Sequence, residues 1–169
     1  MAWTDETIRT ERLLLRAVRD RDRPAVVTYL TDAQVREFLG GPVELPPDFD
    51  SHPLGQQPGV WGVQPDGSET IVGTVSITHR RDRPEISYNL IPSAWGRGYA
   101  AESCAAVLDW VWDTTTDDQV IAVTQVANTT SLALLARLGF AESERFEEFG
   151  AEQSLHILDR PHREYRASG

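Results

Sequence analysis

The chain has 169 residues, 40% of them hydrophobic, and carries 26 acidic against 16 basic side chains, a formal net charge of −10. This length supplies one hydrophobic core and excludes two. We therefore expect a single domain over residues 1–169, with a folded core at about 10–160 and a tail at 161–169.

Composition also restricts the location and the partners. Cys104 is the single cysteine, so no disulfide can form within the chain. The first residues lack the apolar core of a signal peptide, and the apolar runs are too short to span a membrane, so we expect a cytoplasmic protein without a membrane partner. The acidic balance disfavours nucleic acid and favours a cationic partner such as a protonated amine, although the acidic side chains could equally serve solubility alone.

The first 60 residues predict a strand, helices and a loop. Residues 12–18 have a strand pattern, and residues 20–38 have the periodicity of one or two amphipathic helices, broken near Thr31 and Asp32. Residues 40–59 contain half of the prolines and predict a long loop. A loop of this length in a compact domain is usually functional or mobile.

Antiparallel strands are expected next. Residues 60–63 and 70–78 flank a turn signal at 65–67, and residues 80–84 form the following turn. The strand after that turn passes through Pro92 into a glycine-rich turn.

This glycine-rich turn, Trp95-Gly96-Arg97-Gly98-Tyr99-Ala100-Ala101, opens a helix. A glycine turn at a helix N-terminus presents unpaired N–H groups and the positive end of the helix dipole, which suits a pyrophosphate. The Walker sequence is absent. The glycine spacing also fits a dinucleotide fingerprint, but a fingerprint of that kind is followed by further βαβ units, and here a single strand–helix pair follows.

The helix that begins near Ala100 is apolar over most of its circumference, so we expect it to be buried, with its tryptophans in the core. Residues 120–126 predict a strand. Asn128 then caps a helix that Gly139 ends, with Phe140 packing back, and a final hairpin follows.

The two motifs together resemble the GNAT superfamily of acyl-CoA-dependent N-acetyltransferases. The Gly-x-Gly-x-Ala turn is similar to that family's CoA pyrophosphate loop, and the Asn128-x-x-Ser131 helix is similar to its second CoA-contacting segment. The run Thr10 to Arg16 and the Trp-Gly-Arg-Gly-Tyr-Ala loop most resemble the ribosomal-protein N-acetyltransferase (RimJ/RimL-like) branch.

The resemblance implies a fold and an activity. The fold is α/β (α+β), with a mixed, mostly antiparallel central sheet flanked by helices and splayed at the acyl-CoA site. The activity is transfer of an acetyl group from acetyl-CoA to a primary amine, either a protein N-terminal α-amine or a small-molecule amine, by direct attack in a ternary complex. The alternatives are a different acyl-CoA donor and a catalytically silent CoA-binding or sensor domain. A homodimer is left open.

The resemblance also implies a cofactor site. The backbone N–H of Leu90 would hold the acetyl carbonyl and act as an oxyanion hole. Trp95, at a position where many family members carry Gln or Arg, would either wall the CoA channel or pack beneath it. The residues expected to contact CoA are Leu90, Ile91, Trp95, Gly96, Arg97, Gly98, Tyr99, Ala100, Ala101, Asn128 and Ser131.

Two side chains are candidates for proton transfer. Glu85 could act as the general base through a water molecule, or it could be a solvated residue at a strand edge. Many superfamily members carry a tyrosine acid where this chain has Leu135. The resemblance to the RimL-like branch instead makes Ser131 the residue that protonates or holds the sulfur; the alternative is a serine that only satisfies backbone groups.

The acceptor site is less defined. Tyr88 and Asn89 are candidate acceptor-binding residues, and strand alternation lets only one of them face the cleft. His79 could bind the acceptor or replace Glu85 as base. Relative to the resembled family, the Pro-rich segment 42–58 replaces a longer helical stretch, so the acceptor pocket is expected to be remodelled. We expect no metal, because His156, Asp159 and His162 need not converge.

Overall fold

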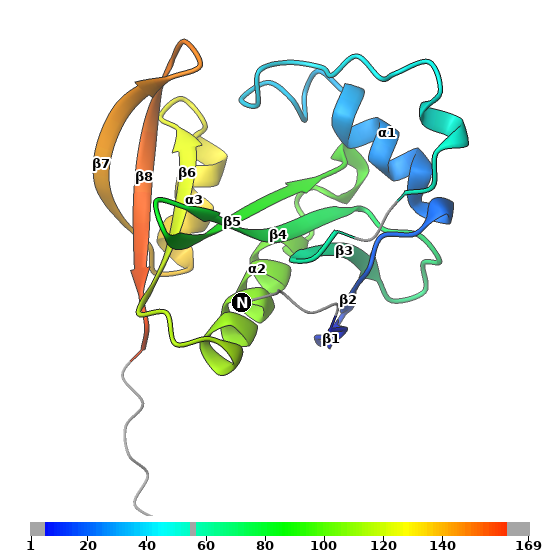
Figure 1. The fold of residues 1–169 in the computed structure, drawn as a ribbon. Coiled ribbons are helices and arrows are strands. Elements are labelled where there is room, and N and C mark those ends of the chain that lie inside the picture. Colours follow the sequence, from blue (N-terminus) through cyan, green and yellow to red (C-terminus); the bar gives the residue numbers. More distant parts are fainter. Residues whose placement is uncertain (1–5, 55–56, 162–169) are drawn as a thin grey trace, which may run out of the picture.

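Eight strands form one sheet within the part of the chain that this computed structural model describes, residues 6–54 and 57–161. Their order is β1-β2-β3-β4-β5-β6-β8-β7 (Figure 1). The strands are β1 (Ile8–Arg9), β2 (Leu13–Arg16), β3 (Val60–Pro65), β4 (Gly73–Arg80), β5 (Arg83–Leu90), β6 (Gln119–Gln125), β7 (Ala141–Glu148) and β8 (Ala151–Asp159).

Three α-helices cover the sheet within those residues: α1 (Arg23–Thr31), α2 (Tyr99–Thr114) and α3 (Thr129–Arg137). Short 3-10 turns lie at Asp20–Asp22, Phe49–Ser51 and Pro92–Ala94. Helix α2 packs against β2, β4 and β5, α3 packs against β6, and α1 packs against β4. Figure 1 shows α1 and α2 on opposite sides of β3–β5. Among the described residues, no helix is long and apolar enough to cross a membrane.

The main core lies between the sheet and α2, as the apolar sequence of this helix predicts. Its buried side chains include Val107, Trp110 and Val111, and Trp110 meets Trp61 of β3 edge to face at 5.0 Å between ring centroids. Aromatic pairs prefer this arrangement. The helix tryptophans are therefore core residues, as predicted.

The sheet separates between β5 and β6. This is the one parallel strand pair among the described residues, and the two strands pair at a single register position, Glu85 with Ile121. Beyond it β5 and β6 diverge (Figure 1). The predicted mixed, mostly antiparallel and splayed sheet is thus confirmed.

Several predicted boundaries are wrong. The strand predicted over 12–18 ends at Arg16, because the Arg16 guanidinium turns to a buried ion pair with Asp22. The helix predicted over 20–38 does break near Thr31, but residues beyond Asp32 form turns and no second α-helix, although the Asp32 carboxylate accepts hydrogen bonds from two following N–H groups as a helix cap would.

Two further strand predictions need correction. The strand predicted over 70–78 begins at Gly73 and extends to Arg80, and β1 was not predicted. The loop predicted over 40–59 contains one 3-10 turn, at Phe49–Ser51, and residues 55–56 lie outside the described part. Of the predicted tail, all but Pro161 lies outside the described residues.

Candidate active site

The glycine-rich turn has the backbone conformation that an anion site needs. Gly96 and Gly98 have φ values of 73° and 79°, in the left-handed region that favours glycine. Gly98 is the N-cap of α2, and its carbonyl accepts the first helical hydrogen bond, from Glu102 N–H at 3.1 Å. The N–H groups of the first turn, Tyr99 to Ala101, therefore have no partner within the helix. This geometry fits a pyrophosphate, and exposed Arg97 adds a positive charge.

A second arginine supports this turn and was not anticipated from the sequence. The Arg12 guanidinium donates 2.9 Å to the Arg97 carbonyl and 2.7 Å to the Glu102 carboxylate, and it stacks 5.1 Å from the centre of the Tyr99 ring. Burial works to raise the pKa of Glu102, but hydrogen bonds from Thr10 and Arg12 outweigh it and lower that pKa. Arg12 thus neutralises a carboxylate on the first turns of α2. Spacing gives no signal for a contact between residues 90 positions apart.

At the carboxyl end of β5, two backbone N–H groups face the separation between β5 and β6. Ile91 donates its N–H to Val72 at 2.8 Å, so it is used within the sheet. Because successive residues of a strand point their polar groups to alternate sides, the N–H groups of Leu90 and Tyr88 point away from β4. The Leu90 amide, predicted for this role, therefore faces the gap between the ends of β5 and β6. The Tyr88 amide faces the same gap, and it was not predicted for this role.

Trp95 lies over this strand end. Its indole N–H donates to the Leu90 carbonyl at 2.8 Å, while the side chain stays 46% exposed. The indole therefore borders the gap and occupies an acceptor that a ligand pairing with β5 could use, and its role beside CoA stays a prediction.

The face of β5 away from α2 is polar. Glu85, Ser87 and Asn89 alternate with the core-facing Ile86 and Leu90, and their cross-strand neighbours on β4 are Thr78, Ser76 and Thr74. Asn89 accepts a hydrogen bond from Thr74 at 3.5 Å. Of the two acceptor candidates, Asn89 thus shares this face with Glu85.

Glu85 is in an ionic network at the start of β5. Its carboxylate lies 3.5 Å from Arg80, which also binds Glu148 at 2.6 Å. Burial raises the pKa of Glu85, Arg80 opposes the rise, and Glu148 adds to it. Glu85 and Leu90 are five positions apart on the strand, about 16 Å between Cα atoms, so Glu85 can reach an amine beside Leu90 only through water.

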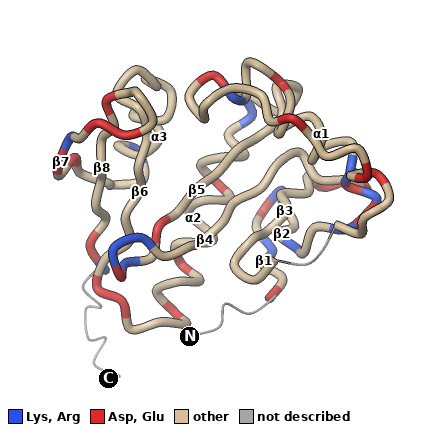
Figure 2. The backbone as a smooth tube through the Cα atoms, turned by 45° about the horizontal axis from the view of Figure 1, so that its top comes forward, with Lys and Arg blue, Asp and Glu red and all other residues tan. Residues whose placement is uncertain are grey.

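The β4–β5 turn is rich in arginine (Figure 2), and its side chains reach β7. Besides the Arg80–Glu148 pair, Arg81 binds Glu144, and both arginines stack on Phe146. His79 is exposed on the same sheet face as Ile77, opposite to the face of Glu85. It therefore cannot replace Glu85 from that face.

Ser131 and Tyr88 meet on the α2 side of the gap. Asn128 caps α3 by accepting the Ser131 N–H at 3.1 Å, which confirms the predicted cap. The Ser131 hydroxyl lies 2.5 Å from the Tyr88 hydroxyl. Leu135, in place of the tyrosine of the resembled family, is 1% exposed in the core.

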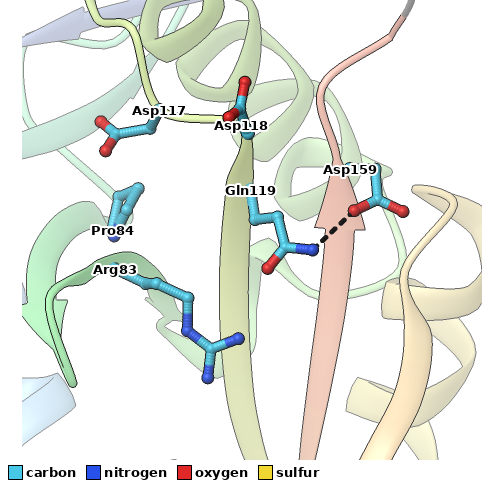
Figure 3. A pocket seen from close by; sticks show the side chains of 6 residues that line it. All are labelled: Arg83, Pro84, Asp117, Asp118, Gln119 and Asp159. Carbon is cyan, nitrogen blue, oxygen red and sulfur yellow. Dashed lines mark hydrogen bonds between the residues drawn. The ribbon is translucent and has the colours of Figure 1, made fainter.

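A separate pocket of about 400 Å³ lies at the other end of β5. Figure 3 shows Gln119 hydrogen-bonded to Asp159. The other residues that line the pocket are Asp117, Asp118, Arg83 and Pro84. None of the predicted site residues lines it. Within the described residues no group of three or more His, Cys, Asp or Glu side chains is arranged to hold a metal ion, and His162 lies outside them.

Acetyltransferases are among the known proteins that this chain resembles in sequence and in fold. The family described as "Acetyltransferase (GNAT) domain" matches residues 12–141. An "Uncharacterized N-acetyltransferase YoaA" of Bacillus subtilis is 24% identical over 144 residues, covering 79% of this chain and 81% of its own length.

Solved structures share the fold. A GNAT-family acetyltransferase from Bacillus anthracis superposes with a TM-score of 0.80 at 21% identity, covering 92% of this chain and 99% of its own. A ribosomal-protein-S5-alanine acetyltransferase from Vibrio fischeri has a TM-score of 0.69 at 15% identity, covering 92% and 97%. Since the family match spans most of the sequence, including the glycine-rich turn, β5 and α3, this chain belongs to the GNAT family of acetyltransferases.

Proposed function

We propose that this protein transfers an acetyl group from acetyl-CoA to a primary amine by direct attack in a ternary complex. One observation carries the proposal: the anion-binding turn at the start of α2 and the free N–H groups of β5 lie at the same end of the sheet, where β5 and β6 have separated. That arrangement suits a ligand with a pyrophosphate at one end and an acyl group at the other.

On the donor side, Gly96 to Ala101 bind the pyrophosphate through backbone N–H groups, and Arg97 adds charge. The pantetheine arm runs along β5, where the Trp95 indole borders it. The amide of Leu90 or of Tyr88 donates to the acetyl oxygen as negative charge develops there. Loss of one such donor costs on the order of 3 kcal/mol in other acyl transfers.

On the acceptor side, the amine approaches from the face that carries Glu85 and Asn89. The amine must be neutral to attack, so a base has to accept its proton. A carboxylate with a raised pKa is a better base than an ordinary one, and Glu85 is such a carboxylate on this face, acting on the amine through a chain of several water molecules. Ser131 stands at the leaving sulfur, on the opposite side of the gap.

For the acceptor we propose a peptide N-terminal amine or a small-molecule amine, on a scaffold of the RimJ/RimL-like branch. The Thr10–Arg16 run supports this branch, and Arg12 of that run contacts the CoA loop. The fold shared with the Vibrio fischeri enzyme does not choose between acceptors. A silent CoA-binding domain is the second candidate, favoured by Leu135 in place of the family's tyrosine.

The test is a screen of amines and short peptides for acetyl-CoA-dependent release of CoA thiol. Turnover with an amine supports the proposal; binding of acetyl-CoA without turnover of any amine supports the silent domain. Protonation of the amine itself lowers kcat/KM in acid, and with an active acceptor Glu85→Gln should remove the further acidic limb that comes from the base. That limb should lie above the ordinary pKa of a glutamate, because burial raises the pKa of Glu85. Glu11→Gln, at an exposed site, is the matched control. An acidic limb unchanged in Glu85→Gln assigns the base elsewhere.

A further inference from the structure

A hydroxyl pair bridges the two halves of the sheet at the proposed transfer site. Tyr88 projects from β5 and Ser131 from the first turn of α3, which follows β6, and their oxygens are 2.5 Å apart. Elsewhere in this region β5 and β6 have already separated. The pair therefore lies between the strand that offers amide groups and the helix that follows the other strand.

The direction of this hydrogen bond follows from acidity. A phenol is a stronger acid than an aliphatic alcohol, so Tyr88 is the better donor and Ser131 the acceptor. Burial raises the pKa of Tyr88 to about 12, so the phenol keeps its proton at neutral pH and can donate it. With its oxygen accepting from Tyr88, Ser131 keeps its own O–H for a third group. Chains of hydrogen bonds also polarise one another, which strengthens that donor.

Ser131 is fixed from its backbone as well. Its N–H donates to the Asn128 side chain at 3.1 Å, so the backbone of Ser131 is held in place at the start of α3. Leu135 cannot donate a hydrogen bond. The hydroxyls in this part of the gap come instead from Tyr88 and Ser131.

We propose that Tyr88 is a positioning residue for the leaving group: it donates to Ser131 Oγ and thereby directs the Ser131 O–H at the CoA sulfur. This inference rests on the proposed acetyl transfer. The amine nitrogen forms the new C–N bond, the C–S bond breaks, and its electron pair stays on sulfur. The Ser131 O–H stabilises that thiolate, the surplus proton of the amine passes to water or Glu85, and solvent protonates the thiolate. The assignment replaces the expectation that Tyr88 binds the acceptor.

Tyr88→Phe removes the hydroxyl and keeps the ring that packs against the core. Hydrogen bonds to charged groups are worth enough that kcat should fall about 10-fold in Tyr88→Phe and about 10- to 100-fold in Ser131→Ala. KM for acetyl-CoA and the melting temperature should change little in Tyr88→Phe. Tyr29→Phe, which removes a half-buried phenol hydroxyl on α1, is the matched control and should keep the wild-type kcat.

Two further readouts separate positioning from a structural role. Because Tyr88 acts through Ser131, the double variant should be no slower than Ser131→Ala alone. The loss in Tyr88→Phe should also shrink with the acetyl thioester of thionitrobenzoic acid, whose more acidic thiol needs less stabilisation as it leaves.

The inference is overturned if Tyr88→Phe keeps the wild-type kcat, if the two losses multiply in the double variant, or if the loss is equal for both thioesters. Failure of the proposed function would look different: the wild-type protein would release no CoA thiol with any amine. Wild-type turnover is thus the control that keeps the two failures apart.

Discussion

Gly73 of β4 lies directly against the end of β5 that carries the Leu90 amide, and its substitution gives the most specific prediction. A Cβ atom at Gly73 would lie 2.1 Å from the Asn89 carbonyl oxygen and 2.7 Å from the Leu90 Cα. Ordinary contacts begin near 3.4 Å, so Gly73→Ala must move β4 and β5 apart by more than about 1 Å. The backbone that moves is the segment carrying the Leu90 amide.

The cost can be estimated. Overpacking and the φ of +154° at this glycine together should destabilise the protein by about 2–5 kcal/mol. A displacement of about 1 Å at a reacting centre lowers turnover on the order of 100-fold. Gly67→Ala is the matched control: its φ is +79°, but a Cβ there meets nothing within 4 Å, so it should cost about 1–2 kcal/mol and leave kcat unchanged.

The assay pairs CoA thiol release with thermal unfolding of both variants. Gly67→Ala should lower Tm by about 2–8 °C without loss of kcat, and Gly73→Ala should lower both. If Gly73→Ala retains wild-type kcat while folded, the placement of the acyl group beside Leu90 is refuted.

Three other changes test separate parts of the structure. Arg12→Ala should raise the Kd for CoA, measured by calorimetry, about 5- to 30-fold, because it frees the glycine-rich turn and leaves the charge of Glu102 unneutralised near the phosphates. Arg9→Ala, which removes an exposed ion pair, is the control and should leave the Kd unchanged. Equal effects of the two substitutions would contradict the role of Arg12. Burial works to raise the pKa of Asp22, but Arg16 and two N–H groups outweigh it and lower that pKa. This lowered pKa adds stability that is complete above the unfolded-state pKa of Asp22 and is lost as the pH falls through its folded-state pKa. In urea unfolding, Asp22→Asn should therefore lower the free energy of unfolding by about 3 kcal/mol at neutral pH and by much less in strong acid. A loss that does not depend on pH would refute this. Acetyl-CoA should change the indole emission of the wild-type protein more than that of Trp95→Phe, since the other tryptophans of the described residues, Trp61, Trp110 and Trp112, are buried. An undiminished change in Trp95→Phe would place the ligand away from Trp95.

Local signals in the sequence were sufficient for the parts of the site built from one segment. The positive φ of Gly96 and Gly98 follows from glycine chemistry, and the Asn128 cap from the preference of asparagine for helix starts. The splayed sheet was predicted from the family resemblance and not from the periodicity of the sequence. Such features depend on neighbours in sequence or on a known family pattern.

Contacts between distant segments could not be predicted in this way. Arg12 reaches Glu102, and Tyr88 reaches Ser131, through the pairing of strands that no local pattern specifies. Strand alternation puts Asn89 on the same side as Glu85 and Tyr88 on the other side, but it could not say which of the two sides faces α2. After Asp32 the chain starts as a helix would, with the Asp32 carboxylate accepting two N–H groups, but only turns follow, and the helical periodicity gave no sign of this.

Ligand-induced thermal stabilisation, measured in parallel with acetyl-CoA, CoA and NAD, tests the central claim most directly. A ligand at about a hundred times its Kd adds about 2.7 kcal/mol, which corresponds to a rise in Tm of about 5–11 °C for a domain of this size. The account predicts this rise with acetyl-CoA and CoA and none with NAD. A rise with NAD alone, or none with either CoA species, would contradict the assignment of the glycine-rich turn to CoA.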